Sequence, residues 1–206
     1  MELSHDVLTN NQLDVPEYPV VFTKPADALA RPDEAIPIHL GAQRWLDYEG
    51  ELAVVVGKDC KNLAEGFDLA DYVLGYTAGN DISARNYQLP AAGGSQFCYA
   101  KSFDKFAPIG PWITSPEVIP DPHSLKYLTR VNGEVVQETG TDDMIWSVKQ
   151  IFRHLTRGTT LRAGTIIMTG TPAGVGYFKN KFLKDGDLVE VEIEGETKLS
   201  NVMKFD

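Results

Sequence analysis

Residues 52–56 constrain the fold most, because this run is apolar at every position and rich in valine. Such a run is typical of a strand that is buried on both faces. Glu49 and Glu51 come directly before it. On a strand, residues i and i+2 project from the same face. We therefore predict that both glutamates point the same way, at the edge of a buried core.

The two glutamates need a partner, because carboxylates held side by side repel each other unless one is protonated or a cation lies between them. Asp81 follows a second apolar run, residues 72–78, and could supply a third oxygen. Glu49, Glu51 and Asp81 are therefore candidate ligands of a divalent metal ion.

Paired glutamates also occur at the solvated ends of strands, where they bind nothing. That pattern recurs near the C-terminus, where Glu190, Glu192 and Glu194 alternate with apolar residues. A half-exposed antiparallel strand shows this alternation, so we assign these three side chains to solvent. No such alternation follows Glu51, and the metal-site interpretation is preferred there.

Composition limits the classes of function. A chain of 206 residues that is 43% hydrophobic predicts a single globular domain. The net charge of −10, without a cluster of Lys and Arg, argues against nucleic acid as a partner. No apolar stretch approaches the ~20 residues that span a membrane, and the N-terminus does not resemble a secretory signal. We expect a soluble intracellular protein with reduced Cys60 and Cys98, cytoplasmic or alternatively mitochondrial.

Turn and periodicity signals predict mostly strands and few helices. The dipeptide at 132–133, Asn-Gly, is typical of a two-residue type I′ hairpin turn. A short helix is predicted at 63–70, and a clear one from its cap Thr141 to Gly158. The Pro and double Gly within 88–99 predict a mobile loop beside the site. Strands are predicted at residues 20–22, 46–56, 72–78, 125–131, 134–137 and 166–168.

Four ordered blocks resemble the signature blocks of the fumarylacetoacetate hydrolase family; they lie at residues 49–57, 80–88, 100–112 and 169–176. Residues 131–134 and 143–145 fit the same pattern, so the resemblance covers nearly the whole chain from about Pro19 onward. It implies a mixed α+β, mostly β fold, with a β-sandwich or β-roll core and few short helices. It also implies an N-terminal lid segment at residues 1–18, a single catalytic domain at 19–206, and a homodimer.

The resemblance implies that Glu49, Glu51 and Asp81 bind Mg²⁺ or Mn²⁺, which Ca²⁺ could replace in crystals. Three oxygen ligands leave positions for substrate and water, and a divalent cation lowers the free-energy cost of the negative charge on an enolate oxygen. The absence of His or Cys nearby in the sequence disfavours zinc.

The resemblance also implies a small anionic oxo acid as substrate and gives Lys101, Gln88 and Thr171 roles in binding it. Lys101 would face the substrate carbonyl or the developing enolate. Gln88 would hydrogen-bond the substrate, and Thr171 would hold its carboxylate. Arg85 could pair with the substrate or, as an ordinary salt bridge, with a metal ligand.

The N-terminus departs from the family pattern. Hydrolytic members carry a His-x-x-Glu pair in which the glutamate orients a histidine that activates water. His5 lies at the right distance before the first block, but Leu8 stands where the glutamate would be. Leucine cannot orient an imidazole, so either Asp6 or Glu17 takes its place or water activation is weak. His5 is still the candidate catalytic base.

The resemblance places metal-dependent hydrolysis of a C–C bond in a 2,4-dioxo acid first, with an acylpyruvate or a fumarylacetoacetate-like substrate and a metal-stabilised enolate. Oxaloacetate decarboxylation, or tautomerisation or isomerisation of an oxo acid, is the alternative, because neither needs a hydrolytic water. A catalytically impaired family member that serves as a binding protein is the third possibility, and Leu8 motivates it.

Overall fold

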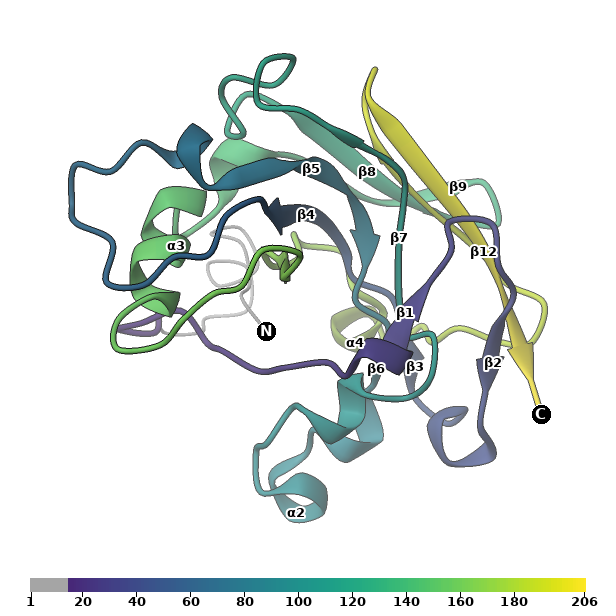
Figure 1. Ribbon diagram of the computed structural model, residues 1–206. Coiled ribbons are helices and arrows are strands. Elements are labelled where there is room, and N and C mark those ends of the chain that lie inside the picture. Colours follow the sequence, from purple (N-terminus) through teal and green to yellow (C-terminus); the bar gives the residue numbers. More distant parts are fainter. Residues whose placement is uncertain (1–14) are drawn as a thin grey trace.

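Two five-stranded sheets form the body of the protein (Figure 1). The computed structural model describes residues 15–206. In spatial order, the first sheet contains β1 (Leu29–Ala30), β7 (Ala107–Thr114), β5 (Val73–Asn80), β4 (Gly50–Val56) and β10 (Ile166–Met168). The second contains β2 (Ile36–Ile38), β12 (Thr197–Phe205), β11 (Leu188–Ile193), β8 (Lys126–Val131) and β9 (Glu134–Gly140).

Helices are few and short, as predicted. The strands β3 (Leu46–Asp47) and β6 (Ser83–Ala84) pair separately from the large sheets. The α-helices are α2 (Pro90–Gly93), α3 (Val148–Leu155) and α4 (Gly176–Lys179). Turns of 3-10 helix lie at Ala26–Ala28, Leu40–Ala42, Leu69–Asp71, Arg85–Tyr87, Tyr99–Lys101 and Thr141–Asp143. The mixed, mostly β fold expected from the sequence is confirmed.

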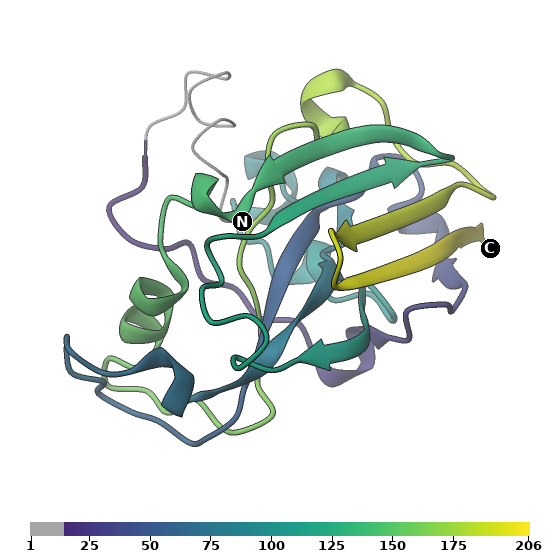
Figure 2. The same cartoon turned by 90° about the horizontal axis from the view of Figure 1, so that it is seen from above.

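The sheets are almost entirely antiparallel, and they curl around a shared core. Only the short edge strands β1 and β2 pair in parallel among the described strands, with β7 and β12 respectively. Figure 2 shows the yellow C-terminal strands beside the β8–β9 hairpin, in agreement with the pairing of β11 to β8. The core packs Leu52 and Val54 of β4 with Val191 of β11, and Phe152 of α3 closes one end. Every residue of β4 is buried, as its apolar run predicted.

In the second sheet the predicted hairpin turn is confirmed, and the predicted exposure of the three C-terminal glutamates holds fully only for Glu194. Asn132 and Gly133 have φ values of 51° and 83°, which is the conformation of a type I′ turn. Glu190 and Glu192 are half-buried on the outer face of β11, where they alternate with buried apolar residues, and Glu194 is exposed.

The helix predicted from Thr141 begins later. The hydroxyl of Thr141 hydrogen-bonds the backbone of Leu125: it accepts from the N–H at 3.0 Å and donates to the carbonyl at 3.2 Å. The helix α3 begins instead after Ser147, whose hydroxyl accepts from the N–H of Gln150, while the side chain of Gln150 accepts from the N–H of Ser147. This reciprocal capping box satisfies two free N–H groups, so Ser147 is the cap.

Other local predictions differ from the structure. Residues 63–70 form no helix, because Gly66 weakens the helical pattern and Asp68 starts a 3-10 turn by accepting from the N–H of Ala70. Residues 20–22 pair with no strand of the described chain. The predicted strand at 46–56 is interrupted at 48–49 and forms β3 and β4. The predicted loop at 88–99 contains α2, and Gly94 with φ 58° caps the end of this helix.

Replacing the cap of α3 tests this account of where the helix begins. Ser147→Ala should lower the free energy of unfolding by about 1 kcal/mol, because the N–H of Gln150 in the first turn loses its acceptor. Urea unfolding monitored by circular dichroism measures the change. Ser147→Thr keeps the hydroxyl and should keep most of the stability; equal losses in both variants would contradict the capping role.

Candidate functional site

The three predicted metal ligands meet at one end of the first sheet. Glu49 precedes β4, Glu51 lies within it, and Asp81 directly follows the antiparallel strand β5. The N–H of Asp81 donates to the carbonyl of Glu49 at 2.8 Å, which ties the two chain segments together. All three side chains are buried, and each offers an oxygen that lies within 4.8 Å of the other two. This group could hold a divalent metal ion.

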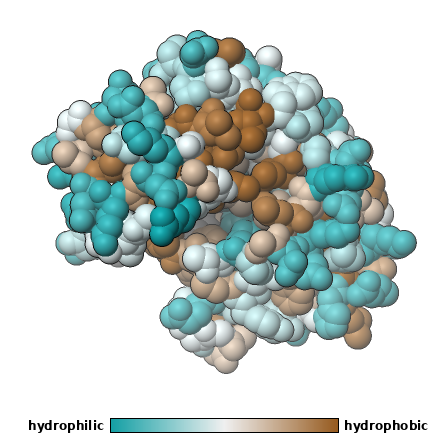
Figure 3. Space-filling view, viewed as in Figure 1, coloured by the Kyte–Doolittle hydropathy of each residue, from teal (hydrophilic) through white to brown (hydrophobic). Residues whose placement is uncertain are grey.

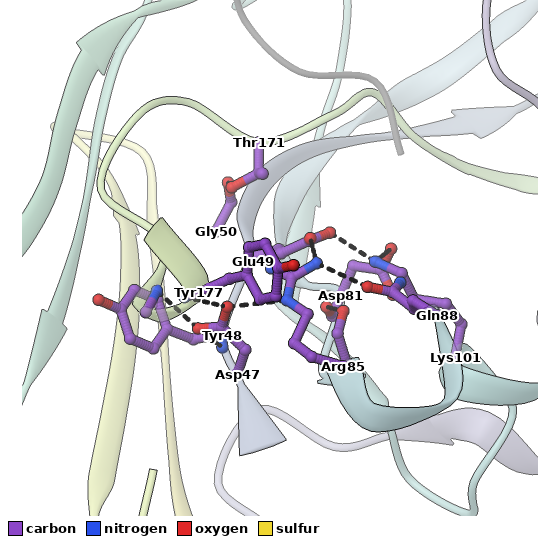
Figure 4. A network of polar contacts seen from close by, with 12 residues as sticks. Asp47, Tyr48, Glu49, Gly50, Asp81, Arg85, Gln88, Lys101, Thr171 and Tyr177 are labelled. Atoms are coloured by element: carbon purple, nitrogen blue, oxygen red, sulfur yellow. Dashed lines mark hydrogen bonds and ion pairs between the residues drawn. The ribbon is translucent and has the colours of Figure 1, made fainter. Parts of the chain in front are cut away.

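Two lysines lie against the acidic group. Lys101 is fully buried, and its Nζ donates to Oε2 of Glu49 at 2.5 Å and to Oδ2 of Asp81 at 2.7 Å (Figure 4). The Nζ of Lys24 donates to Oδ1 of Asp81 at 2.6 Å. Burial alone would raise the pKa of Asp81, but Lys101 and Lys24 hold it at about 2. Burial lowers the pKa of Lys101 less than Asp81 and Glu49 raise it, so its ammonium is charged at neutral pH.

Arg85 connects the acidic group to Gln88. Its NH1 forms an ion pair with Oε1 of Glu49 at 2.6 Å and donates to Oε1 of Gln88 at 3.1 Å. Its Nε donates to Oδ2 of Asp47 at 2.8 Å. The salt bridge to a predicted ligand, one of the two roles expected of Arg85, is therefore present, and Gln88 lies beside it (Figure 4).

Asp47 is part of the site, although the sequence analysis did not select it. Its side chain is fully buried and accepts from the N–H groups of Gly176 at 2.8 Å and Tyr177 at 2.9 Å, the first residues of α4. Through Arg85 it therefore joins α4 to Glu49. One signal was present: Asp47 extends the i, i+2 alternation of Glu49 and Glu51 by one step.

Glu51 is buried in surroundings that disfavour a charged carboxylate. Its Oε2 accepts from the N–H of Gly170 at 2.7 Å. Burial, and then the charges of Asp81 and Glu49, raise the pKa of its carboxyl well above the ordinary value. A divalent cation would remove this repulsion, and three carboxylates match the oxygen ligands that Mg²⁺ and Mn²⁺ prefer. The residues present therefore fit the metal that the sequence predicts.

Thr171 lies next to the peptide that joins the two glutamates. Its hydroxyl donates to the carbonyl of Gly50 at 3.1 Å and accepts from Nε2 of Gln137 at 2.8 Å. The side chain is fully buried. The hydroxyl is thus bonded within the protein, and a contact between Thr171 and a substrate carboxylate stays a prediction.

A cavity of about 450 Å³ opens beside the acidic group. Lys24, Glu51 and Asp81 line its polar part. Most of the remaining wall is apolar and comes from residues 19–22, α3 and β10. Figure 3 shows the hollowed face with apolar side chains gathered beside it, and in Figure 1 the purple N-terminal segment passes from α3 towards β1. The cavity therefore joins a charged end, at the acidic group, to a mostly apolar wall.

The predicted base His5 and the neighbouring Leu8 lie outside the described residues, as does most of the predicted lid segment. Among residues 15–206, no helix is long and apolar enough to cross a membrane.

Comparison with known proteins gives consistent matches. The family described as Fumarylacetoacetate (FAA) hydrolase C-terminal matches residues 3–204. An uncharacterized protein of Archaeoglobus fulgidus is 50% identical, over 88% of this chain and 68% of its own. The oxaloacetate tautomerase YisK of Bacillus subtilis is 41% identical, over 96% of this chain and 65% of its own. The chain thus spans about two thirds of the length of these relatives.

A solved structure shares the fold. The fumarylacetoacetate hydrolase of psychrophilic Exiguobacterium antarcticum superposes with a TM-score of 0.84 at 40% identity, covering 91% of this chain and 66% of that one.

Removing the charge of Asp47 tests whether it supports the site. Asp47→Asn should lower the free energy of unfolding by about 3 kcal/mol, because Arg85 stays buried with one carboxylate fewer. Urea unfolding measures the loss. Asp59→Asn is the control, since the ion pair of Asp59 with Arg162 is exposed and should matter little. Similar effects of the two substitutions would contradict the role of Asp47.

Proposed function

We propose a function from one premise: the chain belongs to the fumarylacetoacetate hydrolase family, whose C-terminal domain matches residues 3–204. The proposed function is the divalent-metal-dependent tautomerisation of a small 2-oxo acid, with oxaloacetate as the first substrate to test. Mg²⁺ or Mn²⁺ is the proposed cofactor, and Glu49, Glu51 and Asp81 are its proposed ligands.

The buried acidic group carries this proposal. Three carboxylates lie close together, two of them, Glu51 and Asp81, in the wall of a cavity. A charged lysine, Lys101, contacts Glu49 and Asp81. Burying so much charge is costly, so such a cluster is typical of a functional site. Oxo acids can be tautomerised, decarboxylated or hydrolysed. The similarity to an oxaloacetate tautomerase, which extends over 96% of this chain, favours tautomerisation among these reactions.

Tautomerisation moves one proton. The C–H bond beside the ketone breaks, its electron pair forms the C=C bond, and the ketone oxygen gains a proton to become the enol. A divalent ion held by the three carboxylates would act as a Lewis acid on that oxygen. Lys101 is a buried cation and can hydrogen-bond the oxygen as its negative charge grows. Nε2 of Gln88 is buried with no partner among residues 15–206. Gln88 lines a separate, smaller cavity beside Arg85 and Tyr177, so its hydrogen bond to the substrate stays a prediction.

Hydrolysis of a C–C bond, which the sequence analysis ranked first, becomes the second candidate. The resemblance to the solved fumarylacetoacetate hydrolase supports it. Hydrolysis needs an activated water, however, and Leu8 stands where the orienting glutamate of the family pattern would be. Tautomerisation needs only a base, for which His5 is still the candidate.

Two structural expectations belong to the same proposal. Residues 1–18 would form a lid over the cavity. A homodimer would cover exposed apolar side chains of β5 and β7, among them Leu74, Trp112 and Ile113.

A metal-reconstitution assay tests the proposed function. Protein stripped with a chelator should lose its acceleration of enol–keto exchange in oxaloacetate and regain it with Mg²⁺ or Mn²⁺, as followed by ultraviolet absorbance of the enol. Pyruvate and CO₂ as products would instead indicate decarboxylation. Acetate and pyruvate from acetylpyruvate would indicate hydrolysis. If no substrate is converted with either ion, the enzyme proposal fails and the alternative of a binding protein is favoured.

Two glutamate variants sharpen this assay. Glu51→Gln should lower kcat/KM about a hundredfold or more, because it removes a charged ligand of the Lewis acid. Glu194→Gln removes an exposed glutamate and should leave the rate unchanged. Full activity of Glu51→Gln would contradict the proposed metal centre.

A further inference from the structure

We propose that Gln137, a residue of the second sheet, positions the two glutamates of the metal centre by holding the peptide between them. The proposal rests on the proposed metal site and adds a positioning residue to it.

The side-chain amide of Gln137 makes three hydrogen bonds. The residue lies in β9 and is 2% exposed. Its Oε1 accepts from the N–H of Gly50 at 3.0 Å. Its Nε2 donates to Oγ1 of Thr171 at 2.8 Å and to the carbonyl of Pro172 at 3.0 Å. Both donor hydrogens of the amide are therefore used, and both go to the loop after β10.

These bonds close a ring around the residue that separates Glu49 from Glu51. The N–H of Gly50 is held by Gln137, and its carbonyl accepts from the hydroxyl of Thr171, which Gln137 also contacts. Figure 4 shows Thr171 pointing at Gly50, close to Glu49. Because Gly50 lies between the two ligands, the orientation of its peptides sets the direction in which both carboxylates project.

Two glycines, Gly50 and Gly174, leave the space in which the amide of Gln137 lies. A Cβ atom on Gly50 would lie 2.0 Å from Oγ1 of Thr129 and 3.3 Å from Oε1 of Gln137. A Cβ atom on Gly174, whose φ is 112°, would lie 2.1 Å from the carbonyl oxygen of Val136 and 3.1 Å from Cγ of Gln137. Glycine at both positions is therefore what allows the two segments to approach β9.

Thr129 provides a matched comparison within the same sheet. It lies directly opposite Gln137 in the β8–β9 ladder, is fully buried, and also packs against Gly50. Its hydroxyl has no hydrogen-bond partner among residues 15–206. Gln137 is thus joined to the ligand strand by hydrogen bonds, whereas Thr129 only contacts it.

Loss of the amide would leave two buried polar groups without this partner, the Gly50 N–H and the Pro172 carbonyl. The Thr171 hydroxyl would keep only its bond to the Gly50 carbonyl. Such groups are costly, so the chain around them would shift to find other partners. A shift at Gly50 moves both glutamates, and the affinity for a divalent ion should fall.

The experiment compares Gln137→Met with Thr129→Val in the full chain. Methionine has a similar length and no amide. Valine replaces the hydroxyl of Thr129, which has no hydrogen-bond partner among residues 15–206, by a methyl group. Calorimetric titration of the metal-stripped proteins with Mn²⁺ should show an affinity about tenfold lower for Gln137→Met, and within twofold of the original for Thr129→Val. Thermal unfolding of the same metal-free proteins is recorded in parallel. It shows whether a variant has lost stability, so that a change in Mn²⁺ affinity can be told apart from a change in folding.

The outcomes separate this inference from the proposed function. If the unaltered protein binds no Mn²⁺, both fail. If it binds Mn²⁺ and Gln137→Met binds equally well, only the positioning role fails. If Gln137→Met does not fold, Gln137→Glu is tested by the same criterion, since it keeps the acceptor for Gly50 but lacks the donors. If neither variant folds while Thr129→Val does, Gln137 determines folding rather than ligand geometry, and the proposal is overturned.

Discussion

The charge balance around Glu49 is the constraint on which the rest of the site depends. Its carboxylate is fully buried and contacts both Lys101 and Arg85, at 2.5 Å and 2.6 Å. Charges are buried in proteins only when they are paired and hydrogen-bonded, because the interior solvates them poorly. The pKa of the neighbouring Glu51 carboxyl lies well above its ordinary value. The nearby positive side chains therefore do not balance the charge of all three carboxylates. A divalent ion is the simplest way to supply the missing positive charge.

The fold brings these groups together from distant parts of the chain. The pairing of β4 with β5 places Asp81 beside Glu49, and Lys24 reaches the same point from the N-terminal segment. The second sheet contributes Gln137 from the opposite side. The sandwich therefore serves both as a hydrophobic core and as a frame that holds a polar cluster at one end of β4.

The sequence predicted the parts of this arrangement that depend on local pattern. The buried strand β4, the paired glutamates and the type I′ turn follow from short-range periodicity and turn chemistry, and Asp81 was selected because it follows a second apolar run. It could not predict contacts that only the fold creates, such as Lys24 with Asp81, 57 residues apart, or Gln137 with Gly50, 87 residues apart. The start of α3 was misplaced for the same reason, since the hydroxyl of Thr141 is used on a neighbouring strand.

The most direct test of this account is anomalous diffraction from crystals of the protein grown or soaked with Mn²⁺. The account predicts a strong anomalous peak at bonding distance from carboxylate oxygens of Glu49, Glu51 and Asp81. A well-ordered structure without density among these three side chains, at saturating Mn²⁺, would contradict it.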